Sequence, residues 1–364
     1  WLASPAQQWR AAGGGLFQWT WNDAYYTIRV LHADTTRDML FAAGVFLDTV
    51  AQKTFHLYGL QNGSWQVLSD SSEDISPSRS LGQYGSKILF GAVKAGIVLW
   101  DDGQLDTIPE AGAISSYEKD GTLYVGGGHD DWNELSPGIV QWDGQQWSGV
   151  AGGMYPYFPY HGGAYVYTLT SYQGYLVAGG NVLNGKDQPE LDLKYLKDGT
   201  WQAIPGWVNG GNTHVNDVLA YQGDLYVAGG FHKSRGALAN GIARWDGQQW
   251  HELGQGFVDP YGVPIAMAVM NGELYVAGRF NEVDGLPAHH IAKWDGERWY
   301  SFSLEPFDRG RYFTSIAVLN DTLYAAGSLV GIGGQNLGNV VYWDGPTDSL
   351  AGPVHATSVP SAPG

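Results

Sequence analysis

The chain has 364 residues and a formal net charge of −17, from 19 basic and 36 acidic residues. This charge opposes binding to phosphate backbones and to anionic lipid surfaces, so no nucleic acid partner is expected. The sequence has no cysteine, which excludes disulfides, thiolate metal ligands and thiol nucleophiles, and it has no apolar run of about 18 residues that would predict a membrane span. With 53 Gly, 16 Trp and 22 Tyr, the composition is typical of short strands joined by tight turns.

Seven short segments with the pattern leucine, aromatic, small, small, glycine recur along the chain, some as weaker copies. Their leucines are, in order, Leu40, Leu89, Leu123, Leu176, Leu225, Leu274 and Leu323. The last four leucines are spaced 49 residues apart. A repeat of this length indicates an array of similar supersecondary units rather than a set of unrelated domains.

One period, from Val215 to Trp250, contains four strand signals. The segments "VNDVLAY", "LYVAGGF" and "GIARW" are separated by turn or loop residues, and Asp246-Gly247 then leads into "QQWHEL". Because Asp-Gly between apolar runs favours a type I′ turn, in which both residues have positive φ, we expect a hairpin there. Four antiparallel strands per repeat predict an all-β fold, a seven-bladed β-propeller with four-stranded antiparallel blades.

The first and last units are incomplete in complementary ways. The seventh unit lacks its fourth strand after Trp343-Asp344-Gly345, whereas "AQQWRAAGGG" (Ala6 to Gly15) matches a fourth strand with no strands before it. We therefore expect the N-terminal strand to complete the last blade and close the ring, which leaves no sheet edge at the seam. The alternative is an open array from which an upstream blade has been cut away.

The predicted propeller covers residues 6–345, and the Pro-, Ser- and Ala-rich stretch 346–364 is predicted to be a linker or tail. The predicted blades are 16–70, 71–112, 113–153, 154–206, 207–256, 257–306, and 307–345 together with 6–15. The chain begins at Trp1 rather than Met, which favours a processed N-terminus.

The repeat "LYVAGGF…IAxWDGxxWxxLGxG" resembles the galactose-oxidase/kelch type of propeller repeat found in many secreted bacterial proteins. The resemblance covers residues 6–345 and implies a propeller in an extracellular or cell-surface protein, or a periplasmic one. The copper-radical activity of galactose oxidase is not implied, because it needs a cysteine cross-linked to tyrosine and this chain has no cysteine. The second unit departs from the pattern: it is shorter and lacks the second tryptophan.

A propeller blade presents two kinds of connection on its two faces. The first-to-second and third-to-fourth turns, which are short here, lie on one face, which we call the short-turn face. The second-to-third and inter-blade loops lie on the other, the long-loop face, and differ from unit to unit, as in "GHDDWNELSPG" and "NVLNGKDQPELD". Binding groups are usually carried on irregular loops over a rigid scaffold, so the long-loop face is the predicted site.

The most distinctive of these loops is "GGMYPYFPYHGGAYVY" (Gly152 to Tyr167). Its aromatic residues and two prolines predict a stiff surface that stacks on sugar rings or anchors a protein partner. The alternative is that the rings only plug the channel mouth or pack between blades. The candidate binding residues are Tyr155, Tyr157, Phe158, Tyr160 and His161 in this loop, and Trp132, Trp207, Tyr261 and Tyr312 in others.

Few residues suggest catalysis. Eight residues before the anchoring leucines, the innermost strands carry Ser115, Thr168, Asp217, Ala266 and Ser315, of which only Asp217 is acidic. Hydrolysis needs paired carboxylates or a partnered histidine, and the adjacent residues His129 to Asp131 and His289-His290 lack metal-ligand spacing. We predict no catalytic residue, no metal and no cofactor.

The expected function is therefore a non-catalytic binding or scaffolding module that recognises a protein or a glycan through the long-loop face. One alternative is a carbohydrate-active enzyme, a glycoside hydrolase or polysaccharide lyase, that uses the same face. The other is a structural subunit of a larger surface assembly.

Overall fold

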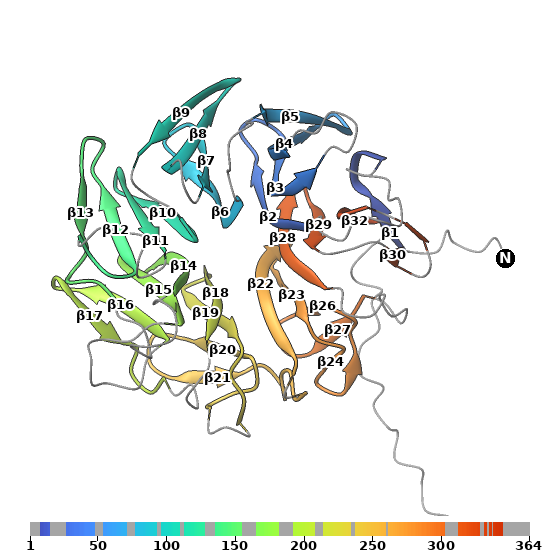
Figure 1. Ribbon diagram of the computed structural model, residues 1–364. Coiled ribbons are helices and arrows are strands. Elements are labelled where there is room, and N and C mark those ends of the chain that lie inside the picture. The colour runs from blue at the N-terminus through green and yellow to red at the C-terminus, as the bar shows by residue number, and fades with distance from the viewer. Residues whose placement is uncertain are drawn as a thin grey trace, which may run out of the picture.

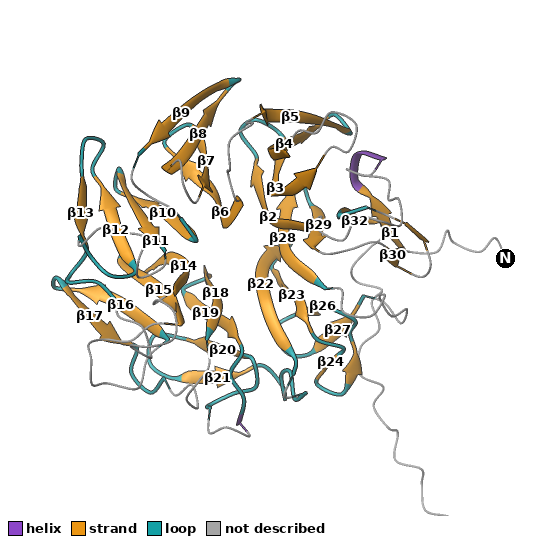
Figure 2. Ribbon diagram, viewed as in Figure 1, coloured by secondary structure: helices purple, strands orange, loops and turns teal. Residues whose placement is uncertain are grey.

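The computed structural model describes sixteen segments of the chain, which form seven four-stranded antiparallel sheets around a central axis (Figure 1). The described residues are 8–14, 27–47, 54–70, 77–92, 96–109, 113–127, 135–154, 165–181, 192–207, 214–233, 237–259, 261–302, 312–327, 331–332, 335–336 and 338–344. Figure 2 shows how strand dominates these segments. The predicted seven-bladed propeller is confirmed.

Each sheet is one blade, numbered here in chain order. Innermost strand first, the blades contain: blade 1, β2 (Thr27–Asp34), β3 (Met39–Leu47), β4 (Thr54–Gln61), β5 (Ser64–Asp70); blade 2, β6 (Pro77–Tyr84), β7 (Lys87–Ala92), β8 (Gly96–Asp101), β9 (Gln104–Ile108); blade 3, β10 (Ser115–Lys119), β11 (Thr122–Gly126), β12 (Ile139–Trp142), β13 (Trp147–Gly149); blade 4, β14 (Tyr165–Tyr172), β15 (Tyr175–Asn181), β16 (Leu193–Lys197), β17 (Thr200–Ala203); blade 5, β18 (Val215–Tyr221), β19 (Asp224–Gly229), β20 (Ile242–Trp245), β21 (Trp250–Glu252); blade 6, β22 (Val263–Met270), β23 (Glu273–Arg279), β26 (Ile291–Trp294), β27 (Trp299–Ser301); blade 7, β28 (Phe313–Leu319), β29 (Thr322–Gly327), β32 (Val340–Asp344), β1 (Gln8–Ala11).

The ring is closed by the N-terminal strand. The innermost strand of every blade contacts the innermost strands of both neighbours, and β2 of blade 1 contacts β28 of blade 7. In blade 7, β1 pairs antiparallel with β32, which places Trp9 opposite Trp343. A 3-10 turn, η1 (Ala12–Gly14), follows β1. The predicted closure is confirmed, and it removes the exposed edge that an open array would carry.

The Asp246-Gly247 turn differs from the predicted type I′ geometry. Asp246 has no positive φ, and the loop between β20 and β21 is four residues long, with Asp246 N donating to Gln249 O at 3.2 Å. Its carboxylate accepts the N–H groups of Gln248 and Gln249, each at 2.8 Å. The side chain of Asp246 therefore sets this turn, as an Asx turn does. Pairs of positive φ occur in other turns, such as the first-to-second turn Gln173-Gly174 (49° and 82°) and the two-residue third-to-fourth turn Asp198-Gly199 (51° and 72°).

The repeated tryptophans join five of the seven blades to the blade before them. The two tryptophans of a unit lie directly opposite each other, as Trp245 and Trp250 do, with ring centroids 5.3 Å apart. The indole N–H of the second tryptophan then donates to a carbonyl that follows the fourth strand of the preceding blade. These bonds are Trp65 to Ala12 (2.9 Å), Trp147 to Pro109 (3.0 Å), Trp201 to Val150 (3.2 Å), Trp250 to Pro205 (3.0 Å) and Trp299 to Leu253 (2.8 Å).

Small hairpins extend two of the long loops. In blade 6, β24 (Glu282–Val283) pairs with β25 (Leu286–Pro287), and in blade 7, β30 (Gly331–Ile332) pairs with β31 (Gln335–Asn336). The apolar core is divided into clusters between adjacent blades; one of them joins Leu31 and Leu40 of blade 1 to Leu319 and Val340 of blade 7.

Candidate binding site at the propeller axis

Five innermost strands carry the same irregularity near their first residues. In β2, β14, β18, β22 and β28 the pairing register shifts by one residue, as in a β-bulge. The extra residues are Arg29, Tyr167, Asn216, Ile265 and Thr314. A bulge leaves one residue unpaired and redirects its side chain, so each of these blades presents one additional side chain at the axis.

A repeated glycine makes the bulge possible. Gly229 lies on β19 opposite the bulge of blade 5, and a Cβ there would overlap the backbone carbonyl of His214. Gly180, Gly278 and Gly327 stand in the same relation to the carbonyls of Tyr165, Val263 and Tyr312. The glycine that ends each leucine-aromatic-small-small-glycine segment therefore permits the close approach of two backbones.

The five bulge residues line a cavity of about 500 Å³ at the axis. Its wall also contains Thr168, Asp217, Ala266 and Ser315, four of the five inner positions derived from the sequence, together with Tyr312. These residues lie where the innermost strands begin, at the end that receives the inter-blade connections. The cavity is therefore on the long-loop face.

Hydrogen bonds between neighbouring blades hold the wall in place. Asn216 Nδ2 donates to Pro264 O at 2.8 Å, and Thr314 Oγ1 donates to Ile28 O at 2.8 Å. In three blades the side chain of the residue after the bulge accepts a backbone N–H group from the next blade, as Ser315 Oγ does from Leu31 N at 3.0 Å. Side chains fixed in this way lose little conformational freedom when a ligand arrives.

Asp217 has an unusual environment for a carboxylate. Its Oδ2 accepts the N–H of Met267 at 2.7 Å, and its Oδ1 accepts the hydroxyl of Thr168 at 3.3 Å. Burial between the innermost strands raises the pKa of Asp217 to about 7, although these hydrogen bonds act in the opposite direction. The carboxyl group therefore bridges three blades and titrates near neutral pH.

Aromatic and basic groups complete the described wall. The Tyr167 ring stacks on Tyr165, with centroids 6.0 Å apart and planes 5° apart, and meets His214 edge-on at 6.3 Å. Arg29 is exposed and Tyr312 is half-buried. Among the described residues that line the cavity, Arg29 is the one basic side chain and Asp217 the one acidic side chain. The described residues hold no group of three His, Asp or Glu side chains placed to bind a metal.

The candidate residues derived from the sequence are placed as follows. Tyr312 lies in the cavity wall, and Tyr261 is 72% exposed in the connection between blades 5 and 6. Trp207 is 6% exposed, and its indole is covered by Phe231 and Trp250, with centroids 5.1 and 4.8 Å away. The others lie outside the described residues: Trp132, Tyr155, Tyr157, Phe158, Tyr160 and His161.

The bulge residues were missed by the sequence reasoning. Counting back eight residues from each leucine located Asp217 and its equivalents but passed over the neighbouring positions 29, 167, 216, 265 and 314. The repeated glycine was the available signal, since a glycine inside a strand often marks a bulge.

Comparison with known proteins identifies the fold and not a family. No family model and no curated protein matches the chain. Many solved structures are similar, and they include the following three. The extracellular domain of BT3049 from B. thetaiotaomicron, a protein assigned to the hybrid two component systems, has 11% sequence identity and a TM-score of 0.52, and the match covers 88% of this chain and 40% of that one.

The other two matches extend over nearly all of the compared chains. The WD40 β-propeller domain of Doa1 has 10% identity and a TM-score of 0.51, with 94% and 99% of the two chains covered. YCF48 bound to the D1 peptide has 13% identity and a TM-score of 0.51, with 91% and 98% covered. At such identities the similarity shows the propeller fold alone. In the described part of the chain, no helix is long and apolar enough to cross a membrane.

Proposed function

We propose that this protein is a non-catalytic binding module of a secreted or cell-surface bacterial protein, and that it recognises a protein or glycan partner through the long-loop face. The observation that carries the proposal is the axial cavity. Its shape is set by a feature repeated in five blades, yet the side chains presented there are all different: arginine, tyrosine, asparagine, isoleucine and threonine. A repeated scaffold with individual side chains is suited to recognising one particular molecule.

The chemistry of the described wall favours binding over hydrolysis. A glycoside hydrolase needs two carboxyl groups, about 5 to 10 Å apart, on the two sides of the reacting bond. Asp217 is the single acid that lines the cavity in the described part of the chain, and its two oxygens already accept hydrogen bonds from Thr168 and Met267. A carboxylate held in this way supports the wall and is poorly placed to act on a substrate.

The remaining parts of the proposal rest on the sequence and on the similar proteins. We include in the proposed site the residues that the sequence indicates, which we call the rim: Tyr155, Tyr157, Phe158, Tyr160, Trp132 and His161, which lie outside the described residues, and the exposed Tyr261. The kelch-type resemblance, together with the similarity to an extracellular domain, supports the proposed location. The similarity to a propeller bound to a peptide supports a protein partner.

The test compares two pairs of tyrosines. Replacing Tyr167 and Tyr312 by alanine removes two rings from the cavity wall, and we expect partner binding to weaken by about tenfold or more. The matched control is Tyr84→Ala with Tyr221→Ala, which removes two half-buried rings from the short-turn ends of innermost strands. Binding is measured on a glycan array and by capture from bacterial cell-envelope extracts, with a melting curve for each variant.

A second variant separates the rim from the cavity. Replacing Tyr155, Tyr157 and Tyr160 together by alanine should abolish binding and leave the melting temperature nearly unchanged. A large fall in melting temperature would identify the three rings as structural filler. Undiminished binding in both multiple variants would move the site away from the long-loop face.

A further inference from the structure

One position of the repeat is different in blade 4 alone. The residue after the anchoring leucine is aromatic in six blades and valine in blade 4, where Val177 pairs with Tyr195. The equivalent aromatic residues are Phe41, Phe90, Tyr124, Tyr226, Tyr275 and Tyr324. The register fixes the equivalence, because Tyr226 pairs with Arg244 and Tyr275 pairs with Lys293 at the same place in their sheets.

The valine lines a hollow between blades 4 and 5. The hollow has a volume of about 280 Å³, and its wall includes Tyr172, Tyr175, Val177, Tyr195 and Trp245. Val177 is fully buried, and Tyr175 and Tyr195 are half-buried around it. Because Gln173 and Gly247 from two short turns also line it, the hollow lies on the short-turn side, away from the axial cavity.

Blade 4 has two aromatic rings at the positions where blades 5 and 6 each have an ion pair. In blade 5, Asp224 and Arg244 are 2.7 Å apart, and in blade 6, Glu273 and Lys293 are 2.8 Å apart. In blade 4 the same two positions hold Tyr175 and Tyr195, whose rings meet edge to face with centroids 5.6 Å apart. Blade 4 has therefore lost the charges and the central ring together, and has gained aromatic walls.

A lysine without a carboxylate partner stands at the rim. Lys197 lines the hollow, and its Nζ lies 5.7 Å from the centroid of the Tyr175 ring. Within the described residues it forms no ion pair, whereas Arg244 and Lys293 of the next two blades each pair with a carboxylate. The Lys197 ammonium group is thus a hydrogen-bond donor available to a ligand in the hollow.

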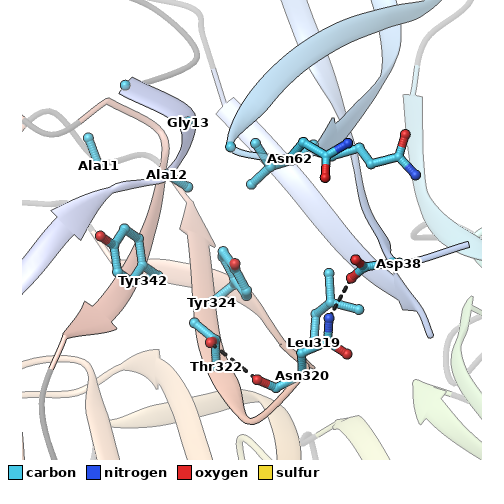
Figure 3. A pocket seen from close by; sticks show the side chains of 14 residues that line it. Ala11, Ala12, Gly13, Asp38, Asn62, Leu319, Asn320, Thr322, Tyr324 and Tyr342 are labelled. Atoms are coloured by element: carbon cyan, nitrogen blue, oxygen red, sulfur yellow. Dashed lines mark hydrogen bonds between the residues drawn. The ribbon is translucent and has the colours of Figure 1, made fainter.

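The corresponding place at the ring seam has a different character. A hollow of about 530 Å³ lies between blades 7 and 1, where Tyr324 retains the aromatic residue that blade 4 lacks (Figure 3). Its wall contains polar turn residues, and Asn320 donates a hydrogen bond to Asp38 across the seam (Figure 3). Tyr342 occupies the position of Tyr195, so the seam provides a matched control.

We propose that the hollow between blades 4 and 5 binds one neutral pyranose ring of a glycan. The aromatic walls suit the apolar C–H face of a sugar ring, and the polar rim suits its hydroxyl groups. An apolar peptide side chain of the same size would cover the Lys197 ammonium group and the Tyr175 hydroxyl without giving them acceptors, which is unfavourable. The formal charge of −17 opposes an acidic sugar or another anion.

The decisive variant restores the residue of the other blades. Val177→Tyr should fill the hollow, leave the melting temperature at or above that of the unmodified protein, and reduce sugar binding by about tenfold or more. Tyr195→Ala should also weaken binding by about tenfold, whereas Tyr342→Ala, the same change at the seam, should leave it unaltered. The probes are an array of neutral oligosaccharides, with uronate-containing oligosaccharides and a proline-rich peptide as alternatives, followed by titration calorimetry with the best neutral binder.

The possible results separate this proposal from the one for the long-loop face. Loss of sugar binding in Val177→Tyr, with retention in the Tyr167→Ala, Tyr312→Ala protein, supports the site between blades 4 and 5. The proposal is overturned if no neutral oligosaccharide binds, if binding survives Val177→Tyr, or if the uronate or the peptide is the ligand lost in that variant. Loss in the Tyr167→Ala, Tyr312→Ala protein alone would assign the sugar to the axial cavity.

Discussion

Lys194 is a fully buried basic side chain on strand β16. It lies between Ala178 and Ala203 of the neighbouring strands and is 0% exposed, and its Nζ has no hydrogen-bond partner among the described residues. Burial lowers the pKa of Lys194 to about 7, and the nearby charge of Asp192 only partly opposes this shift. The amine is therefore protonated more readily in the unfolded chain than in the folded protein.

The direction in which the free energy of unfolding changes with pH follows from the number of protons that Lys194 binds in the folded and unfolded states. Between pH 7 and the ordinary lysine pKa of 10.5, the unfolded chain binds more protons at Lys194, so the free energy of unfolding rises with pH in this window. Its slope is at most about 1.4 kcal/mol per pH unit. Lys194→Met should remove this contribution and stabilise the protein at pH 7 by about 1 to 3 kcal/mol.

Urea unfolding of both proteins at several values between pH 7 and 10 measures the effect. Taking the difference between the two free energies of unfolding cancels the contributions of the tyrosines and of the chain terminus, which titrate in both proteins. The interpretation fails if the stability of the two proteins changes in parallel over this range, or if the methionine variant is the less stable one at pH 7.

Strand β1 is the element on which the closed ring depends. Trp9 is 3% exposed and packs against Phe302, Phe313 and Trp343, with ring centroids 5.8, 5.4 and 5.4 Å away. Deleting residues 1–13 removes this indole, the Ala12 carbonyl that accepts the N–H of Trp65, and the partner strand of β32. We expect several kcal/mol of destabilisation and association through the freed edge of β32.

Light scattering after size exclusion and thermal melting test this expectation. Removing residues 346–364 is the matched control, and it should change neither property. If the truncated chain does not fold, Trp9→Ala provides a milder variant, expected to cost about 3 to 5 kcal/mol. An N-terminal deletion protein that remains monomeric with an unchanged melting temperature would show that β1 contributes little to the ring.

The strands were predictable where the same residues recur in the same positions of successive blades. The tryptophans and the anchoring leucines recur because most blades make the same contact with a neighbour, so the strands and the closure by β1 could be derived. The geometry of the Asp246-Gly247 turn could not be derived, because it depends on the Asp246 carboxylate accepting two backbone N–H groups. The bulge residues were also missed, because counting from the leucines assumes an unbroken alternation along the innermost strand.

The candidate binding sites were predictable only in part, because they lie where the repeat varies. The sequence indicated the long-loop face and placed Tyr312 and Asp217 near it, and both line the axial cavity. The hollow beside Val177 was overlooked even though the valine is visible in the sequence. The valine alone does not predict a hollow, because the hollow also requires Tyr195, which the strand register places opposite Val177, and Trp245 of the next blade.

The charge of the molecule determines which partners it can approach. The formal charge is −17, and several of its few basic side chains already pair with carboxylates. Arg37 pairs with Asp34 at 2.7 Å, Arg244 with Asp224 and Lys293 with Glu273. Pairing of this kind leaves little positive surface for phosphate groups, while the net field repels polyanions at distances up to about 10 Å at moderate salt.

We therefore expect no retention of the protein on duplex DNA or on vesicles that contain anionic lipid at about 150 mM salt. Gel-shift and vesicle-sedimentation measurements between low and moderate salt test this, because counterion release makes phosphate binding fall steeply as salt rises. Salt-sensitive DNA binding in the micromolar range would mean that unpaired cations gather on one surface despite the net charge. The protein should remain unretained at the lowest salt as well, since removing the screening strengthens the repulsion between its net charge of −17 and a polyanion.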